Sequence, residues 1–339
     1  MKRRSAVTLT LLLLPMVALI AAIVFGGPRE LPPMGSINNP FKQVDFSDLP
    51  PLLHFTALDG ASLAYRKYSP PSASSRGSVV LVHGSSASSN SMHPMAKAFA
   101  RAGYVAYALD IRGHGDSGQK GHIAYVGQLE DDLESFVRAI SPPPPSTLAG
   151  FSTGGGFALR VAGSARQDMF QNYLLLSPFL SQDAPTYRPA TGGWVNVGVP
   201  RIVGITLLNA VGLKAFNDLP VMSFALNEQA KSFLTPEYSF ALASNFRPER
   251  DYSANVRAAR GPCAIVAGAA DELFFTEKFE PTIRSLGKSW PVTLLPGIGH
   301  IPLTLEPDAL AAAVAAVEGM RLSKSPDVTG STPVHREHL

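Results

Sequence analysis

The sequence predicts an α/β fold in which a mostly parallel sheet is covered by helices on both faces. Two observations lead to this prediction. Short runs rich in β-branched residues alternate with segments of helical apolar spacing, and this order recurs from residue 51 to residue 322. The longest interruption separates two strand-like runs and reads as an insertion. We therefore expect one large α/β domain over residues 51–322 that carries an inserted segment.

Eight runs have the length and composition of strands, and they predict an eight-stranded sheet. The first two, 51–58 and 62–68, are adjacent in the chain and predict an antiparallel hairpin. The other strands are expected at 78–84, 104–110, 147–151, 173–177, 263–268 and 292–297. Helices are expected between most of them, at 91–103, 128–140, 152–163, 276–287 and 305–319.

The insertion lies between the strands expected at 173–177 and 263–268. Residues 181–250 contain apolar stretches with helix-compatible spacing, which predict a cap seated over the strand ends. Part of this cap could line a binding pocket, and the rest would form its own core. The apolar residues of the first stretch are Trp194, Val195, Val199, Ile202, Val203, Ile205, Leu207, Leu208, Val211, Leu213 and Phe216.

The N-terminus has the pattern of a membrane-targeting segment. Lys2, Arg3 and Arg4 precede residues 5–27, which contain no charged residue. This pattern predicts an N-terminal anchor over residues 1–27 or, as the alternative, a cleaved signal peptide. The basic residues would stay in the cytoplasm, which predicts a catalytic domain on the other side, periplasmic or extracellular. Residues 28–50 are expected to be a linker, and residues 323–339 a flexible tail.

Composition excludes several kinds of site. A net charge of +3 with scattered basic residues argues against a nucleic-acid partner. The single cysteine, Cys263, rules out an intramolecular disulfide and a multi-cysteine zinc site, and its apolar run places it in a buried strand. No ligand cluster or phosphate-binding glycine loop is recognisable, so neither metal nor organic cofactor is expected.

The segment GFSTG, residues 150–154, is a match to the G-x-S-x-G pattern. It lies between an expected strand and an expected helix, where a sharp turn would expose the hydroxyl of Ser152. Such a turn needs very small neighbours two positions away on either side, and Gly150 and Gly154 satisfy that need. The motif therefore predicts that Ser152 is a nucleophile at the carboxyl edge of the sheet.

A serine nucleophile needs a base, which is normally a histidine oriented by a carboxylate. Asp271 follows the expected strand 263–268, and His300 follows the expected strand 292–297. Both would lie at carboxyl ends of strands, where α/β sheets assemble their sites. We expect His300 to be the general base and Asp271 to orient it; Glu272 is the adjacent competitor for the second role.

The oxyanion of an acyl-transfer intermediate needs two N–H donors. The amide of Thr153, directly after the nucleophile, and the amide of Ser85, in the loop after the strand 78–84, are the candidates. His83 lies beside this loop, and we interpret it as a brace that forms hydrogen bonds there rather than as a second base.

These segments resemble the α/β-hydrolase superfamily, and within it the group of monoacylglycerol lipases, lysophospholipases and serine aminopeptidases. The resemblance spans roughly residues 50–320 and rests on VVLVHGSS, LAGFSTGG, AGAADELF, GIGHIPL and the lipase-like stretch from Asp110 to His122. It implies an α/β-hydrolase fold and a triad of Ser152, Asp271 and His300. The cap shows no recognisable sequence, so the resemblance does not identify the substrate.

The expected function is hydrolysis of carboxylic esters through an acyl-enzyme, with a lipid-like acyl ester of the monoacylglycerol or lysophospholipid type as substrate. An aminopeptidase, an amidase or a short-chain esterase would use the same triad. A protein of another class, which keeps the fold only to bind a ligand, would not need a complete triad. Labelling of Ser152 by a fluorophosphonate separates these two classes.

Overall fold

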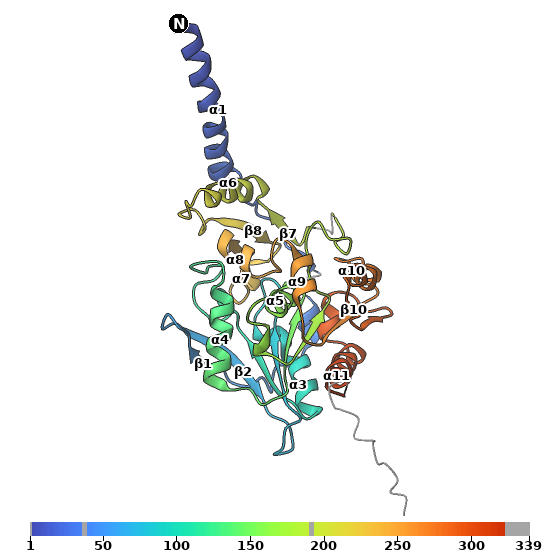
Figure 1. Cartoon of the computed structure of the whole chain (residues 1–339). Coiled ribbons are helices and arrows are strands. Elements are labelled where there is room, and N and C mark those ends of the chain that lie inside the picture. Colours follow the sequence, from blue (N-terminus) through green and yellow to red (C-terminus); the bar gives the residue numbers. More distant parts are fainter. Residues whose placement is uncertain (1, 36–38, 190–192, 323–339) are drawn as a thin grey trace, which may run out of the picture.

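The computed structural model describes residues 2–35, 39–189 and 193–322. Its main sheet has eight strands in the order β1-β2-β4-β3-β5-β6-β10-β11 (Figure 1). Every strand expected from the sequence is present in this sheet. Their bounds are Leu53–Thr56 for β1, Ser62–Tyr68 for β2, Ser78–Val82 for β3, Val105–Leu109 for β4, Ser146–Phe151 for β5, Asn172–Leu176 for β6, Cys263–Gly268 for β10 and Val292–Leu295 for β11.

Most pairs in the sheet are parallel. β1 pairs antiparallel with β2, as the predicted hairpin requires, and β2 pairs antiparallel with β4. All the pairs from β4 through β3, β5, β6 and β10 to β11 are parallel. The carboxyl ends of β5, β10 and β11 therefore meet at one edge of the sheet, which is the edge that carries the predicted site.

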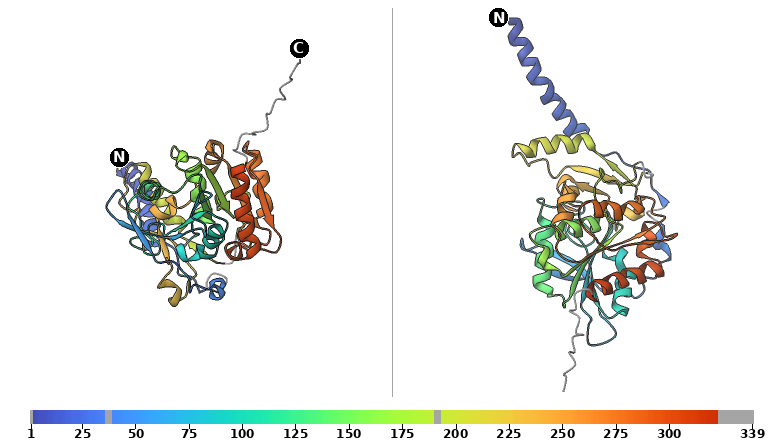
Figure 2. Two further views of the ribbon diagram at one scale, coloured as in Figure 1. Left: turned by 90° about the horizontal axis from the view of Figure 1, so that it is seen from below. Right: turned by 45° about the vertical axis from the view of Figure 1, so that its right-hand side comes forward.

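Helices cover both faces of the sheet (Figures 1 and 2). Along β10, Ile265 and Ala267 pack on one face, whereas Ala264 and Val266 pack on the other. A central strand that is buried on both faces needs such a continuous apolar run. The first face is covered by α4 (Gln128–Ile140), α5 (Thr153–Ala162), α9 (Tyr252–Ala258) and α10 (Phe279–Ser285), and the second by α3 (His93–Arg101) and α11 (Pro307–Leu322).

A cap is inserted between β6 and β10. It contains β7 (Val195–Val197), α6 (Val199–Ala210), β8 (Pro220–Phe224), α7 (Glu228–Lys231), β9 (Glu237–Ser239) and α8 (Phe240–Asn245). β7, β8 and β9 form a second, antiparallel sheet. The helix-compatible spacing expected within residues 181–250 was wrong for the residues of β7 and β8, which pair with each other, and β8 pairs also with β9. Strand pairing depends on partners elsewhere in the chain, which local spacing does not reveal.

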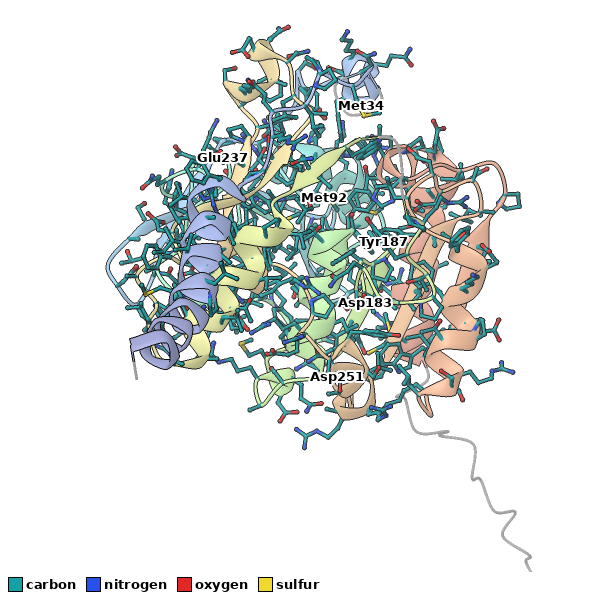
Figure 3. All side chains as sticks on the ribbon, turned by 90° about the horizontal axis from the view of Figure 1, so that it is seen from above. Met34, Met92, Asp183, Tyr187, Glu237 and Asp251 are labelled. Carbon is teal, nitrogen blue, oxygen red and sulfur yellow. The ribbon has the colours of Figure 1, made fainter. Side chains whose placement is uncertain are left out.

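The N-terminal helix α1 (Lys2–Phe25) leaves the molecule from α6 (Figures 1 and 2). Its last turns pack on protein: Ile23 is buried, and a Cβ added to Gly204 of α6 would lie 3.0 Å from Cγ1 of Ile23. Arg201 donates hydrogen bonds to the carbonyl oxygens of Ile23 and Val24, at 2.8 and 3.0 Å. Seen from above, α1 and α6 lie side by side, away from Asp183 and Tyr187 (Figure 3).

Across the described residues, no helix combines the length and the apolar character needed to cross a bilayer. The prediction of a membrane anchor in residues 5–27 is therefore wrong. The predicted location outside the cytoplasm rested on that anchor and loses its support. The signal-peptide alternative receives no support either. The prediction counted uncharged residues, whereas in the structure the end of this run makes specific contacts with α6.

The described parts of the expected linker, residues 28–35 and 39–50, contact the cap and the main domain, respectively. The N–H of Arg29 donates to Oδ1 of Asn196. Asp48 forms an ion pair with Lys97, and its Oδ1 lies within hydrogen-bonding distance, 3.1 Å, of Nε2 of His93. The domain boundaries expected from the sequence stay predictions. The predicted tail, 323–339, lies outside the described residues.

Candidate active site

Ser152 occupies a strained turn between β5 and α5. Its φ is +56° and its ψ is −118°, a combination that non-glycine residues rarely adopt. The two glycines of the motif permit this turn. A Cβ on Gly150 would lie 2.1 Å from the carbonyl oxygen of Gly154, and a Cβ on Gly154 would lie 2.3 Å from that of His83. Any larger residue at either position would displace backbone.

The structure brings Ser152, His300 and Asp271 together, although 148 residues separate the first two in the chain. Nε2 of His300 lies 3.0 Å from Oγ of Ser152, and Nδ1 lies 2.7 Å from Oδ2 of Asp271. All three side chains are buried, with 8% of Ser152 exposed. This geometry lets the hydroxyl of Ser152 donate to His300 while the opposite ring nitrogen donates to the carboxylate.

Asp271 is held as an anion. Burial alone would raise its pKa, but the electrostatic attraction and hydrogen bond of His300 hold the pKa of Asp271 below its usual value. Oδ1 also accepts hydrogen bonds from the N–H groups of Leu273 and Phe274, at 2.8 and 3.0 Å. Glu272 does not reach the ring of His300; its Oε2 accepts from the backbone N–H of that residue at 2.9 Å.

Aromatic rings enclose the imidazole of His300. The ring centroids of Phe151, Phe274 and Trp194 lie 4.7, 5.2 and 5.9 Å from it. Phe151 ends β5 directly before Ser152, Phe274 follows Asp271 in the loop after β10, and Trp194 comes from the segment that leads into β7. The sequence analysis missed this enclosure, although Phe151 stands inside the serine motif. These rings help to bury His300, of which 1% is exposed.

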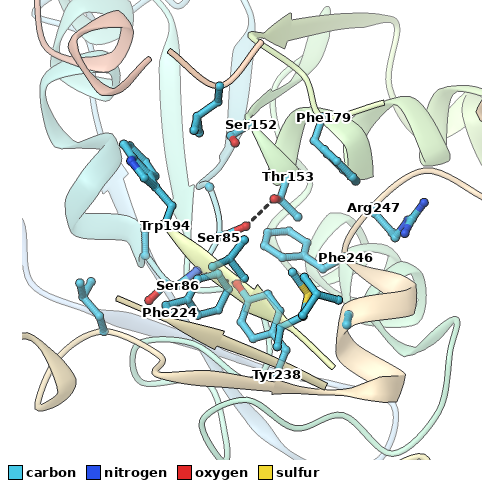
Figure 4. A pocket seen from close by; sticks show the side chains of 18 of the residues that line it. Ser85, Ser86, Ser152, Thr153, Phe179, Trp194, Phe224, Tyr238, Phe246 and Arg247 are labelled. Atoms are coloured by element: carbon cyan, nitrogen blue, oxygen red, sulfur yellow. Dashed lines mark hydrogen bonds between the residues drawn. The ribbon is translucent and has the colours of Figure 1, made fainter. Parts of the chain in front are cut away.

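The two predicted oxyanion residues lie beside the serine. The hydroxyls of Ser85 and Thr153 form a hydrogen bond of 2.5 Å (Figure 4). Thr153 begins α5, and the first N–H groups of a helix have no acceptor within the helix. A Cβ added to Gly84 would lie 3.4 Å from Cβ of Ser152, so the loop that carries Ser85 runs close to the nucleophile.

The cap contributes a tyrosine to this loop. The hydroxyl of Tyr238, in β9, accepts a hydrogen bond from the N–H of Ser86 at 2.6 Å and lies 2.6 Å from Nε2 of His114. Ser86 has a φ of +65°, and its hydroxyl donates to the carbonyl oxygen of Thr235. Burial raises the pKa of Tyr238. The sequence analysis missed this network, because no motif connects residue 238 to residues 85 and 86.

His83 also forms a hydrogen bond with the loop that carries Ser85. Its Nδ1 donates to the carbonyl oxygen of Gly84 at 2.7 Å, and its Nε2 accepts from the N–H of Ile111 at 3.3 Å. Burial lowers the pKa of His83, which favours the neutral ring. The interpretation of His83 as a brace is therefore confirmed.

A cavity of about 1440 Å³ lies between the cap and the edge of the main sheet and reaches Ser152 and His300. Side chains of α6 and β8 make its cap wall apolar. Figure 4 shows Trp194, Phe179, Phe224 and Phe246 around it. Within the described residues, no group of three or more metal-ligating side chains is arranged to hold a metal ion.

Comparison with known proteins identifies a family, a partial relative and structures of similar fold. The profile of the family described as serine aminopeptidase, S33, matches residues 73–308. A monoacylglycerol lipase of Mycolicibacterium smegmatis is 35% identical over 106 residues, which make up 30% of this chain and only 38% of that protein. The match thus spans well under half of this relative.

Two solved structures share the fold. A soluble variant of monoglyceride lipase from Saccharomyces cerevisiae, in complex with a substrate analogue, superposes with a TM-score of 0.61 at 18% identity, over 84% of this chain and 97% of that one. A putative aryl esterase from Burkholderia cenocepacia gives a TM-score of 0.58 at 18% identity, over 81% of this chain and 100% of that one. At these identities the similarity establishes the fold and leaves the substrate open.

Proposed function

The chain belongs to the serine aminopeptidase S33 family of α/β-hydrolases, and we propose that it cleaves carboxylic esters of hydrophobic acyl chains through an acyl-enzyme on Ser152. The family agrees with the resemblance found in the sequence, which implied a hydrolase of this superfamily. The observation that carries the finer proposal is the large, mainly apolar cavity that reaches the hydroxyl of Ser152.

In the proposed reaction Oγ of Ser152 attacks the ester carbonyl carbon while its proton passes to Nε2 of His300. The N–H groups of Thr153 and Ser85 donate to the oxyanion, and Asp271 stabilises the imidazolium. The intermediate collapses, the C–O bond to the alcohol breaks, and His300 protonates the departing alcohol. Water, deprotonated by His300, then attacks the acyl-enzyme and releases the carboxylic acid and Ser152.

The cap wall of the cavity suits an acyl chain. Ile202, Val203 and Leu207 of α6 and Val221 and Met222 of β8 line it. Each methylene that leaves water contributes about 0.8 kcal/mol, so such a wall favours long chains over acetyl groups.

The residues that line the cavity give less support to the hypothesis that the protein is an aminopeptidase. An enzyme that binds a free α-amino group needs an unpaired carboxylate near its serine. Among the lining residues that the structure describes, Glu249 has the only carboxylate, and an ion pair of 2.9 Å joins it to Arg160. The triad would cleave an amide as well as an ester, so substrate binding separates the two activities.

The test is a comparison of kcat/KM across p-nitrophenyl acyl esters of increasing chain length, with leucine p-nitroanilide as the aminopeptidase substrate. We expect kcat/KM to rise with acyl length and the anilide to be a poor substrate. Highest activity on the anilide, or on the acetyl ester with no gain from added methylenes, would contradict the proposal.

A further inference from the structure

Arg247 lines the same cavity and has no ionic partner in the part of the chain that the structure describes. It follows α8, and its guanidinium lies over the ring of Phe179, 5.4 Å from the centroid (Figure 4). No carboxylate among the described residues lies within ion-pairing distance of it. Burial lowers the pKa of Arg247; the attraction of the exposed Asp183 opposes this effect, and the charge of Arg160 adds to it.

Arg160, which also lines the cavity, differs from Arg247 because it is paired with carboxylates. Its guanidinium forms ion pairs with Glu130 at 2.5 Å and with Glu249 at 2.9 Å. The carboxylate nearest in sequence to Arg247 is therefore already occupied. A partly buried cation without a counterion is costly, and an anionic ligand would offset that cost.

The backbone around Arg247 is held in place. Oδ1 of Asn245 accepts from the N–H groups of Gly127 and Leu129, and its Nδ2 donates to Glu130. On the other side, Pro248 packs on the first turn of α5, where a Cβ added to Gly156 would lie 2.6 Å from its Cδ. Because α5 begins directly after Ser152, Arg247 stands at a fixed place relative to the nucleophile.

The cavity thus has two unlike walls. The cap wall at α6 and β8 is apolar, whereas the wall at residues 247–250 is polar. It carries Arg247, Arg250 and Glu249, whose carboxylate is paired with Arg160. Lys42 adds a third basic side chain to the lining for which the described residues give no ion pair. An acyl chain fits the first wall, which leaves the second for the alcohol part of the ester.

We propose that Arg247 binds an anionic group, of the phosphate class, on the alcohol part of the acyl ester. A guanidinium suits this role because its N–H groups can donate two parallel hydrogen bonds to one phosphate. The assignment rests on the proposed function for the direction in which the ester lies. Binding of the anion itself does not require turnover, so the two can be tested apart.

The first experiment compares hydrolysis of 1-octanoylglycerol with that of its 3-phosphate, which carries the same acyl chain. We expect wild-type kcat/KM to favour the phosphate, and Arg247→Gln to reduce kcat/KM for the phosphate by about tenfold or more while it leaves the neutral ester within about twofold. Arg257→Gln is the matched control, because it removes an exposed arginine of α9 that does not line the cavity. Equal loss on both substrates in Arg247→Gln would contradict the assignment, as would a wild-type preference for the neutral ester.

The second experiment measures binding of octyl phosphate by calorimetry. We expect Arg247→Gln to weaken it about tenfold or more and Arg257→Gln to leave it unchanged. Unchanged affinity in a folded Arg247→Gln protein would overturn the inference even if Ser152 reacts with a fluorophosphonate. Inorganic phosphate that binds as tightly as octyl phosphate would also overturn it, because the apolar wall would then contribute nothing. Arg247-dependent binding without fluorophosphonate labelling would support the anion site and remove the proposed ester hydrolysis.

Discussion

The main sheet and the cap contain similar apolar residues, but these residues differ in how deeply they are buried. In the sheet, Val80, Leu148 and Ile265 are fully buried between the sheet and the helices that cover one of its faces. In the cap, Val203 and Leu207 of α6 are more than half exposed, although they also line the cavity. Close packing on both faces fixes a backbone, whereas a thinly covered helix can adjust to what it binds. The sheet edge therefore suits a fixed catalytic geometry, and the cap suits selection of the substrate.

The largest expected effect comes from removing the proposed nucleophile at the carboxyl edge of the main sheet. Ser152→Ala should reduce kcat by roughly 10⁴- to 10⁶-fold, because members of a triad act as one unit. Thermal unfolding should be unchanged or slightly improved, since the strained serine is replaced without loss of packing. Retention of more than about a tenth of wild-type turnover in a folded variant would remove Ser152 from its proposed role.

A second change tests which carboxylate serves His300. Asp271→Asn should lower kcat by about 10⁴-fold, because an amide at Nδ1 favours the wrong tautomer. Glu272→Gln is the matched control: it keeps an acceptor for the N–H of His300 and should cost only a few-fold. Steady-state kinetics on one ester measures both. Similar losses in the two variants would mean that the carboxylate roles are shared.

Substitutions in the cap should have a smaller effect on kcat/KM, and this effect should depend on the acyl chain of the substrate. Leu207→Ser should lower kcat/KM for long acyl esters by about tenfold and leave the acetyl ester nearly unchanged, because Leu207 lines the cavity. Phe216→Ser is the control, since Phe216 belongs to the cap but does not line the cavity. A loss that is equal for short and long chains in Leu207→Ser would argue that this residue supports folding rather than the acyl chain.

The smallest effect concerns stability against pH. Burial lowers the pKa of His83 and holds the pKa of His114 well below its usual value. The unfolded chain therefore binds protons below about pH 6.5 that the folded protein does not, so the free energy of unfolding should fall as pH falls from 7 to 5. The slope can reach about 1.4 kcal/mol per pH unit for each histidine. Urea unfolding at several pH values measures it, and His114→Gln should flatten the dependence; a pH-independent free energy would contradict the burial argument.

The same comparison explains what the sequence could predict. All eight strands of the main sheet were predictable, because each is a short apolar run between clear breaks. The positions of Ser152, Asp271 and His300 also followed, since Ser152 comes directly after β5 and the other two lie in the loops after β10 and β11. The β7–β9 sheet and the Tyr238 network could not be predicted, because each depends on partners from distant parts of the chain. The place of Arg247 in the cavity wall could not be predicted either, because the cavity is assembled from the cap and the main domain. The N-terminal anchor was mispredicted for the same reason: the contacts of Ile23 with α6 are invisible in a count of apolar residues.

The central claim is that Ser152 is the activated nucleophile of this fold. The most direct test is to treat the full chain with a fluorophosphonate and locate the adduct by peptide mass spectrometry. We predict one adduct, on the peptide that contains Ser152, formed at a rate that falls by orders of magnitude in His300→Ala. An adduct on a different serine, or no adduct on a folded protein, would contradict the claim.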